Sequence, residues 1–132
     1  MVITIHQPEH FPYEGFFQKM AAAELFIILD NVNYRKNYFQ NRNQLLNKNG
    51  VEEWFTIQVE KGATSKQIKD VKVVDGPWRK KIVKKLKQNL GVDLTHIYEY
   101  DNLMDINIQS IEYCREILNI NTPMLYASKL DV

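Results

Sequence analysis

The feature that most constrains the fold is a pair of apolar runs near the N-terminus, separated by one helical pattern. Residues 2–5 are a β-branched run, and residues 24–30 hold a second, almost uninterrupted apolar run, which predicts a strand covered on both faces of its sheet. Between them, Pro12 suits the first turn of a helix that extends to residue 23. Its apolar positions recur at helical spacing and would pack on the sheet: Phe16, Phe17, Met20 and Ala21. Because crossover connections are right-handed, this pattern predicts a strand-helix-strand unit with parallel strands.

Polar residues follow both predicted strands. The first strand ends in His6-Gln7-Pro8, and the second ends at Asp30. The carboxyl ends of parallel strands meet at one edge of a sheet, where α/β proteins commonly bind ligands. An imidazole titrates near neutrality, so we predict His6 as a general base or hydrogen-bond donor and Asp30 as the group that orients it or the attacking amine. Gln7 is a predicted substrate-binding residue at the same edge.

The rest of the chain predicts a hairpin, two more helices and three more strands. Asn49-Gly50 lies between two apolar runs and predicts a type I′ turn, whose two central residues both need positive φ. The flanking strands are predicted at 44–46 and 53–59, the further strands at 68–74, 94–100 and 124–127, and the helices at 78–90 and 103–118. The predicted fold class is α/β: a three-layer-like parallel or mixed sheet begun by the strand-helix-strand unit, with an inserted antiparallel hairpin.

Size and charge limit the class of protein. A chain of 132 residues that is 45% hydrophobic can bury one core, so we expect residues 1–132 to form a single domain. The formal net charge of +1 favours no polyanionic partner. Met1 does not begin a signal-peptide pattern, and the apolar run at 25–29 is too short to span a bilayer. We therefore expect a cytoplasmic protein with no membrane partner.

Several common chemistries find no support in the residue spacing. The histidines and Cys114 show neither Cys-x-x-Cys nor His-Glu-x-x-His spacing, so no metal site is predicted, and no particular cofactor is indicated. Cys114 lies on the apolar stripe of its helix, where a thiol is normally inert. There is no glycine-rich phosphate loop, so a phosphate would need charge-assisted hydrogen bonds from side chains such as Lys19, Arg35, Lys36 and Arg42.

Residues 33–43 form a polar and aromatic stretch, which predicts a functional loop that leads into a strand. Tyr34 and Tyr38 are candidates to stack on a base or sugar, or alternatively to cover the hairpin. Asn41 and Arg42 are predicted to bind substrate, and the alternative is a solvated strand edge. The lysine-rich helix at 78–90 is explained by a solvated face, so nucleic acid is not an expected partner.

Taken together, these motifs resemble the WbqC-like family along nearly the whole chain. The matching residues occur in the family's order: His6-Gln7-Pro8, Pro12, Gly15-Phe16-Phe17, Lys19, Leu29-Asp30-Asn31-Val32-Asn33-Tyr34, Gln40-Asn41-Arg42-Asn43, Trp54, Lys61-Gly62 and Trp78-Arg79-Lys80. The resemblance implies a transferase of bacterial surface-polysaccharide (O-antigen) biosynthesis, which moves a glycyl or other acyl group to an amino sugar or nucleotide-linked substrate. The expected ligand is an anionic small molecule, a nucleotide or nucleotide sugar, with its phosphates held by Lys19, Arg35 and Arg42.

The chain departs from the family's pattern at three points. Asp30-Asn31 stands where the family often has two acidic residues, and Tyr13 stands where it usually has tryptophan. Family members usually continue into further helices, so we expect residues 1–132 to be a short form without that C-terminal extension. An edge left exposed in this way favours self-association, and a homo-oligomer is therefore expected.

Two other functions stay open at this point. The order of strand, His/Pro loop, glycine at the helix start and strand also resembles the opening of HIGH-type nucleotidylyltransferases, in which Gly15 would allow a nucleotide to approach closely. The paired histidines of that motif are absent from this helix start. The other function is non-enzymatic, a domain that binds a nucleotide, a saccharide or another protein.

Overall fold

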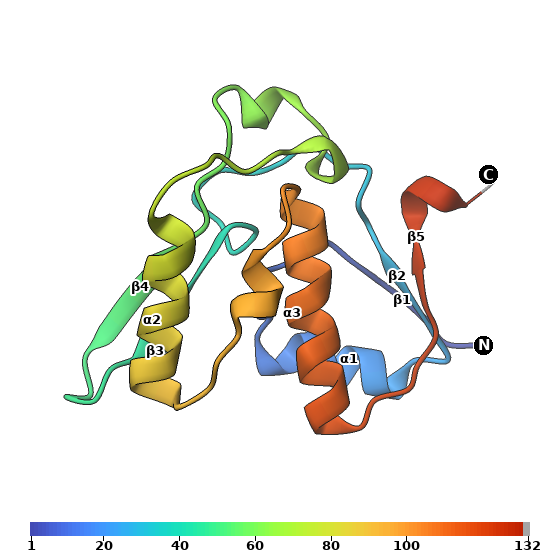
Figure 1. The fold of residues 1–132 in the computed structure, drawn as a ribbon. Coiled ribbons are helices and arrows are strands. Elements are labelled where there is room, and N and C mark those ends of the chain that lie inside the picture. The colour runs from blue at the N-terminus through green and yellow to red at the C-terminus, as the bar shows by residue number, and fades with distance from the viewer. Residues whose placement is uncertain (131–132) are drawn as a thin grey trace.

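The computed structural model describes residues 1–130 and shows two sheets on either side of a central helix (Figure 1). In chain order the strands and α-helices are β1 (Ile3–His6), α1 (Glu14–Ala22), β2 (Leu25–Ile28), β3 (Arg42–Leu46), β4 (Glu52–Thr56), α2 (Trp78–Leu90), α3 (Leu103–Leu118) and β5 (Met124–Tyr126). Short 3₁₀ helices lie between them: η1 (Ala63–Ser65), η2 (Ile68–Asp70), η3 (Thr95–Tyr98) and η4 (Ala127–Lys129). The fold is α/β, as predicted.

The predicted strand-helix-strand unit is confirmed. Strands β1 and β2 pair in parallel, with Ile3 opposite Leu25 at one end and His6 opposite Ile28 at the other. Strand β5, also predicted, adds to β2 in parallel and gives the order β1-β2-β5. The carboxyl ends of all three strands therefore lie at one edge of this sheet.

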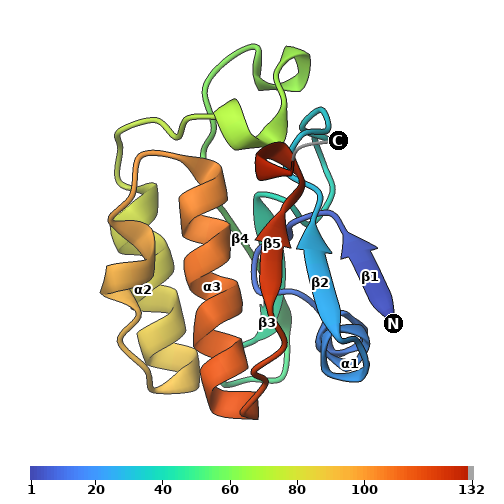
Figure 2. The same ribbon diagram turned by 90° about the vertical axis from the view of Figure 1, so that its right-hand side faces the viewer.

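Among residues 1–130, only one face of the parallel sheet is packed. Phe26 and Ile28 are fully buried, and they lie in one apolar cluster with side chains of α1 and α3: Phe16, Phe17, Met20, Met104 and Ile111. On the other face Ile3, Ile5 and Leu125 are 49%, 58% and 41% exposed. Figure 2 looks onto this face and shows that no helix of residues 1–130 lies in front of it.

The prediction of a sheet covered on both faces is thus wrong for the described residues. The reason lies in the strand order. Each crossover steps to the next strand in the same direction, and right-handed crossovers that do so place their helices, α1 and α3, on the same side. Ala21, predicted to pack on the sheet, is exposed at the outer side of α1.

The predicted hairpin is confirmed, and it forms a separate sheet of β3 and β4, paired from Arg42–Thr56 to Leu46–Glu52. Its turn differs from the predicted type I′. The Gly50 N–H donates to Asn47 O at 3.0 Å, and Gly50 alone takes a positive φ, 75°, among the described residues of the turn. A type I′ turn would require the same of Asn49. Strand β4 also ends at Thr56, before the predicted residue 59.

The strands predicted at 68–74 and 94–100 are wrong. These segments hold η2 and η3, and residues 72 and 73 form only isolated bridges with other segments. Their apolar side chains fill the core beneath the hairpin, in contact with α2 and α3: Ile68, Val71, Ile97 and Tyr98. Short 3₁₀ turns bury these residues without a strand partner, which a pattern of alternation alone does not reveal.

Helix α3 joins the two halves of the molecule. Leu103 and Ile106 pack into the cluster under the hairpin, whereas Met104 and Ile111 pack against the parallel sheet. The helix begins at the predicted cap: Asn102 Oδ1 accepts from the N–H groups of Met104 at 2.8 Å and Asp105 at 3.4 Å. Helix α2 has the predicted bounds and ends at Gly91, which has a φ of 72°.

Replacing Asn102 by alanine is expected to lower the free energy of unfolding by about 1 kcal/mol, because the first turn of α3 loses its side-chain acceptor. Urea denaturation at constant pH measures the change. Glu116→Ala, an exposed substitution within the same helix, is the control and should shift the midpoint little. Equal losses in both variants would contradict the capping role.

Candidate functional site

His6 lies at the carboxyl end of β1, as predicted, and a backbone carbonyl orients its ring. Nδ1 lies 2.8 Å from Gln7 O, and the ring packs edge-on against Phe16 with centroids 4.8 Å apart. A carbonyl oxygen only accepts, so Nδ1 carries the proton and donates it. In the neutral ring Nε2 therefore keeps its lone pair, and no hydrogen bond to it exists within residues 1–130. The imidazole is half-buried and is held in the tautomer that a general base needs.

Asp30 has different partners from those predicted. Its side chain is 4% exposed, and its oxygens accept from Ser128 N at 2.8 Å and Ser128 Oγ at 2.6 Å. The carboxylate thus fixes the start of η4 after β5. The described residues show no hydrogen bond between Asp30 and His6, so Gln7 O orients the imidazole, and the other role predicted for Asp30, to orient the attacking amine, stays a prediction.

Three charged or polar side chains lie around His6: Glu9, Lys19 and Tyr13. Glu9 was not predicted from the sequence as a site residue. Burial raises the pKa of the Glu9 carboxyl, although the nearby charges of His6 and Lys19 oppose that rise. Lys19 Nζ lies 3.4 Å from Tyr13 Oη. The space at Gly15 is taken by the Tyr13 ring, because an added Cβ would lie 2.4 Å from Tyr13 Cε2. Gly15 therefore accommodates this tyrosine.

Gln7 links this edge of the sheet to the polar stretch that follows β2. Its Oε1 accepts from Gln40 Nε2 at 3.0 Å, and Gln40 Oε1 accepts from Arg35 N at 2.9 Å. Gln40 is 2% exposed, and both bonds are partly buried. The Arg35 guanidinium lies 4.3 Å from the centroid of the Tyr38 ring. Gln7 thus positions the segment that carries Tyr34, Asn41 and Arg42.

Those three residues come together at a cavity of about 500 Å³ beside the hairpin. The 59–64 loop forms the opposite wall. The lining residues with polar or charged side chains are Tyr34, Lys36, Asn37, Asn41, Arg42, Thr56, Glu60, Lys61 and Thr64. His6, Asp30, Lys19 and Arg35 are not among the lining residues. The predicted site is therefore two groups of residues, with the Gln7–Gln40 bond between them.

Unused hydrogen-bonding atoms mark this cavity. Asn41 donates Nδ2 to Ile57 O at 3.0 Å, but its buried Oδ1 has no partner in the described part of the chain. Arg42 donates Nη2 to Asn37 O at 2.7 Å, and its buried Nε is likewise unpartnered there. A buried polar atom without a partner is costly and rare in a folded protein. Two residues of the cavity wall thus each carry one buried hydrogen-bonding atom, an acceptor and a charged donor, that no described residue uses.

The cavity has an excess of positive charge. Lys36, Arg42 and Lys61 form no ion pair with any of residues 1–130. The one carboxylate of the lining is Glu60, which pairs with Lys66. Burial raises the pKa of the Tyr34 hydroxyl, so this group stays protonated near neutrality although Arg42 opposes the rise. The cavity is therefore suited to an anion, with donors from Arg, Lys and Tyr.

His10 anchors the loop that carries this site. From the sequence, its spacing was weighed only for a metal site, which was not predicted. It is fully buried, with Nδ1 3.1 Å from Asn107 Oδ1 and Nε2 2.7 Å from Tyr98 Oη. Asn107 Nδ2 donates to Gln40 O at 2.8 Å, so its Oδ1 accepts from His10 Nδ1–H and Tyr98 donates to Nε2. The His10 N–H also bonds Phe39 O at 2.9 Å. This network requires a neutral imidazole.

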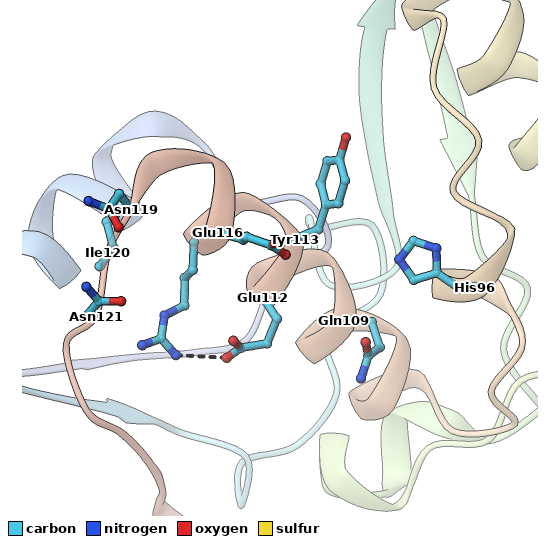
Figure 3. A pocket seen from close by; sticks show the side chains of 9 residues that line it. His96, Gln109, Glu112, Tyr113, Glu116, Asn119, Ile120 and Asn121 are labelled. Carbon is cyan, nitrogen blue, oxygen red and sulfur yellow. Dashed lines mark hydrogen bonds and ion pairs between the residues drawn. The ribbon is translucent and has the colours of Figure 1, made fainter.

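A second cavity, of about 400 Å³, lies along α3 and contains none of the predicted site residues (Figure 3). Its charged groups are Glu112, Arg115 and Glu116, with His96 at one side. Arg115 Nη1 bonds Glu112 Oε1 at 2.8 Å, the pair joined in Figure 3, and its Nη2 bonds Thr122 O at 2.5 Å. The buried Nε of Arg115, like that of Arg42, has no partner within residues 1–130, but the two carboxylates of this cavity outnumber its one arginine and make it unsuited to an anion.

Residues 1–130 contain no group of three or more His, Cys, Asp and Glu side chains that could hold a metal ion. None of the helices in the described part of the chain has both the length and the apolar character needed to cross a bilayer. Burial raises the pKa of the Cys114 thiol to about 11, which leaves it protonated at neutral pH, as an inert cysteine would be.

Comparison with known proteins gives one family and one curated relative. The model of the WbqC-like protein family matches residues 7–132. The uncharacterized protein Rv1507c of Mycobacterium tuberculosis is 30% identical over 79 residues, which are 59% of this chain and 34% of that protein. This chain thus matches about a third of the relative's length. No solved structure matches the chain.

Proposed function

This chain belongs to the WbqC-like protein family, and we propose on that premise that it binds a phosphate-bearing small molecule in the cavity beside the hairpin. The observation that carries the proposal is that Arg42 and Asn41 each have one buried polar atom, Nε and Oδ1, that lacks a partner in the described residues. Phosphate oxygens would accept from Arg42, Lys36 and Lys61, and a ligand hydroxyl would donate to Asn41 Oδ1.

We further propose transfer of an acyl or glycyl group to an amino sugar as the reaction, which is the activity that the family resemblance implies. In such a transfer the amine nitrogen forms a bond to the acyl carbon, and the bond from that carbon to the donor's leaving group breaks. The amine releases one proton. His6 does not line that cavity, and it is the proposed acceptor of the proton because Gln7 O holds its ring with Nδ1 as the donor and Nε2 as the acceptor.

Arg42→Gln is expected to weaken binding of inorganic pyrophosphate by about 10- to 100-fold, since a charge-assisted pair of bonds is lost. Isothermal titration calorimetry measures the affinity. Lys48→Gln removes one positive charge from the turn of the same hairpin, away from the cavity, and is the matched control. Absence of pyrophosphate binding by the unaltered protein, or equal losses in both variants, would contradict the proposed site.

Mass spectrometry of an amino sugar nucleotide incubated with activated acyl donors tests the transfer step. The expected result is an N-acylated product whose formation requires His6. Binding of the sugar nucleotide without product over a range of acyl donors would instead favour the non-enzymatic alternative. Incorporation of a nucleotidyl group would favour the nucleotidyltransferase.

A further inference from the structure

We propose that a smaller hollow next to the cavity beside the hairpin is a nucleobase subsite, so that the ligand of this protein is a nucleoside diphosphate or one of its sugar conjugates. The hollow has a volume of about 240 Å³ and includes Trp54, Thr56 and Gln58 in its lining. This inference rests on the proposed function, because the phosphates would lie in the larger cavity.

The two hollows adjoin through one shared residue and one side-chain contact. Thr56 lines both of them. Arg42 lines the larger cavity, and its guanidinium carbon lies 4.2 Å from the centroid of the Trp54 ring. The register of the hairpin explains this proximity: Arg42 pairs with Thr56, and Trp54 precedes Thr56 by two residues on the same face of β4. A ligand that reaches Arg42 with its phosphates therefore has an indole ring beside it.

Trp54 is exposed, unlike the other tryptophan. Trp54 is 41% exposed, whereas Trp78 is 3% exposed. Phe39, which is 44% exposed, stacks on Trp54 with a centroid distance of 6.1 Å and an interplanar angle of 25°. Single exposed apolar residues are ordinary, but two stacked aromatic rings next to Arg42 form a surface on which a planar ring can stack.

The polar groups of the hollow suit the edge of a base. The Thr56 hydroxyl and the Gln58 side-chain amide are exposed, and neither forms a side-chain hydrogen bond within residues 1–130. The hydroxyl and the amide each offer both donors and acceptors. Lys85 Nζ donates to Trp54 O at 2.9 Å and so fixes the backbone beneath the indole. An aromatic face with donors and acceptors at its side recognises a planar heterocycle with polar edges.

The test compares the affinities of uridine diphosphate, adenosine diphosphate and inorganic pyrophosphate by calorimetry, with tryptophan fluorescence recorded in parallel. At least one nucleoside diphosphate is expected to bind tenfold or more tighter than pyrophosphate and to quench the emission of the exposed Trp54. In Trp54→Leu the ratio of the two affinities should fall to near one, and in Trp54→Phe it should be largely retained. Leu46→Ala, an exposed change on the same face of the hairpin, is the control and should keep the ratio.

The outcomes separate this inference from the proposed function. If pyrophosphate binds in an Arg42-dependent way but no nucleoside diphosphate binds more tightly than pyrophosphate, the proposal of a base subsite is wrong and that of an anion site stands. A gain that persists in Trp54→Leu also overturns the subsite. Two affinity ratios are compared: glucose 1-phosphate to inorganic phosphate, and a nucleoside diphosphate to pyrophosphate. If the two ratios are equal, the ring that stacks on Trp54 is a sugar, and a nucleobase subsite is excluded. If neither pyrophosphate nor a nucleoside diphosphate binds, both proposals fail.

Discussion

Acidification from pH 6.5 to pH 3 is expected to remove on the order of 4 kcal/mol of stability through His10 alone. Burial lowers the pKa of His10 from 6.5 to about 3, although its hydrogen bond with Asn107 opposes that change. In the folded protein the neutral ring bonds both Asn107 and Tyr98, and a proton added at Nε2 would require the Tyr98 hydroxyl to change from donor to acceptor.

The sign of the effect follows from proton binding by the two states. Between pH 6.5 and pH 3 the unfolded chain binds a proton at His10 and the folded chain does not, so protonation favours unfolding. The stability is fully present above pH 6.5 and is lost as the pH falls toward 3. The slope in this range is about 1.4 kcal/mol per pH unit for one proton.

Chemical denaturation at several pH values, carried out on the unaltered protein and on His10→Gln, checks this expectation. The stability difference between the two should shrink as the pH falls through the window, because the variant has no imidazole to protonate. His96→Gln is the matched control, since His96 is exposed, and it should leave the pH dependence of the unaltered protein in place. A pH-independent difference for His10→Gln would show that the buried imidazole does not titrate in this way.

Phe26→Ala is expected to lower the free energy of unfolding by about 3–5 kcal/mol, whereas Ile5→Ala on the neighbouring strand should lower it by less than about 1 kcal/mol. Phe26 is fully buried, and its ring packs edge-on against Phe16 with centroids 5.0 Å apart. Its removal leaves a cavity between β2 and the helices. Ile5 lies on the open face of the sheet and is 58% exposed, so little surface is uncovered by its truncation.

This pair of variants also tests the homo-oligomer expected from the sequence, which stays a prediction. Denaturation is measured at low and high protein concentration, with light scattering on the same samples. A loss for Ile5→Ala that rises with protein concentration toward the loss for Phe26→Ala would show that a second copy covers the open face. Unequal losses at every concentration would leave that face uncovered in solution.

Local patterns sufficed for most of the elements. The first three elements, the hairpin, helix α2 and the start of α3 at Asn102 were all predicted from periodicity, caps and turn residues, because each depends on neighbours along the chain. The segments at 68–74 and 94–100 were not, since a run of buried apolar residues has the same pattern in a strand and in a compact loop.

The candidate site shows the same division. The residue types that bind an anion were named from the sequence, but Lys19 and Arg35 lie outside the cavity that Arg42 and Lys61 line. Lys61-Gly62 was part of the family resemblance and could have been placed in the site on that signal. Nothing in the sequence indicated that Asp30 would bond Ser128, that Gln7 would hold Gln40, or that His10 would be buried between Asn107 and Tyr98.

The sequence by itself determined the parallel strand-helix-strand unit, the position of His6 at its edge and the family, because backbone periodicity and motif order are properties of neighbouring residues. Only the tertiary structure decided which face of the sheet stays open, which cations share a cavity and which polar atoms are left without a partner. Those properties depend on contacts between segments as far apart as 102 residues, the separation of Met20 and Thr122, and on the desolvation that such contacts impose.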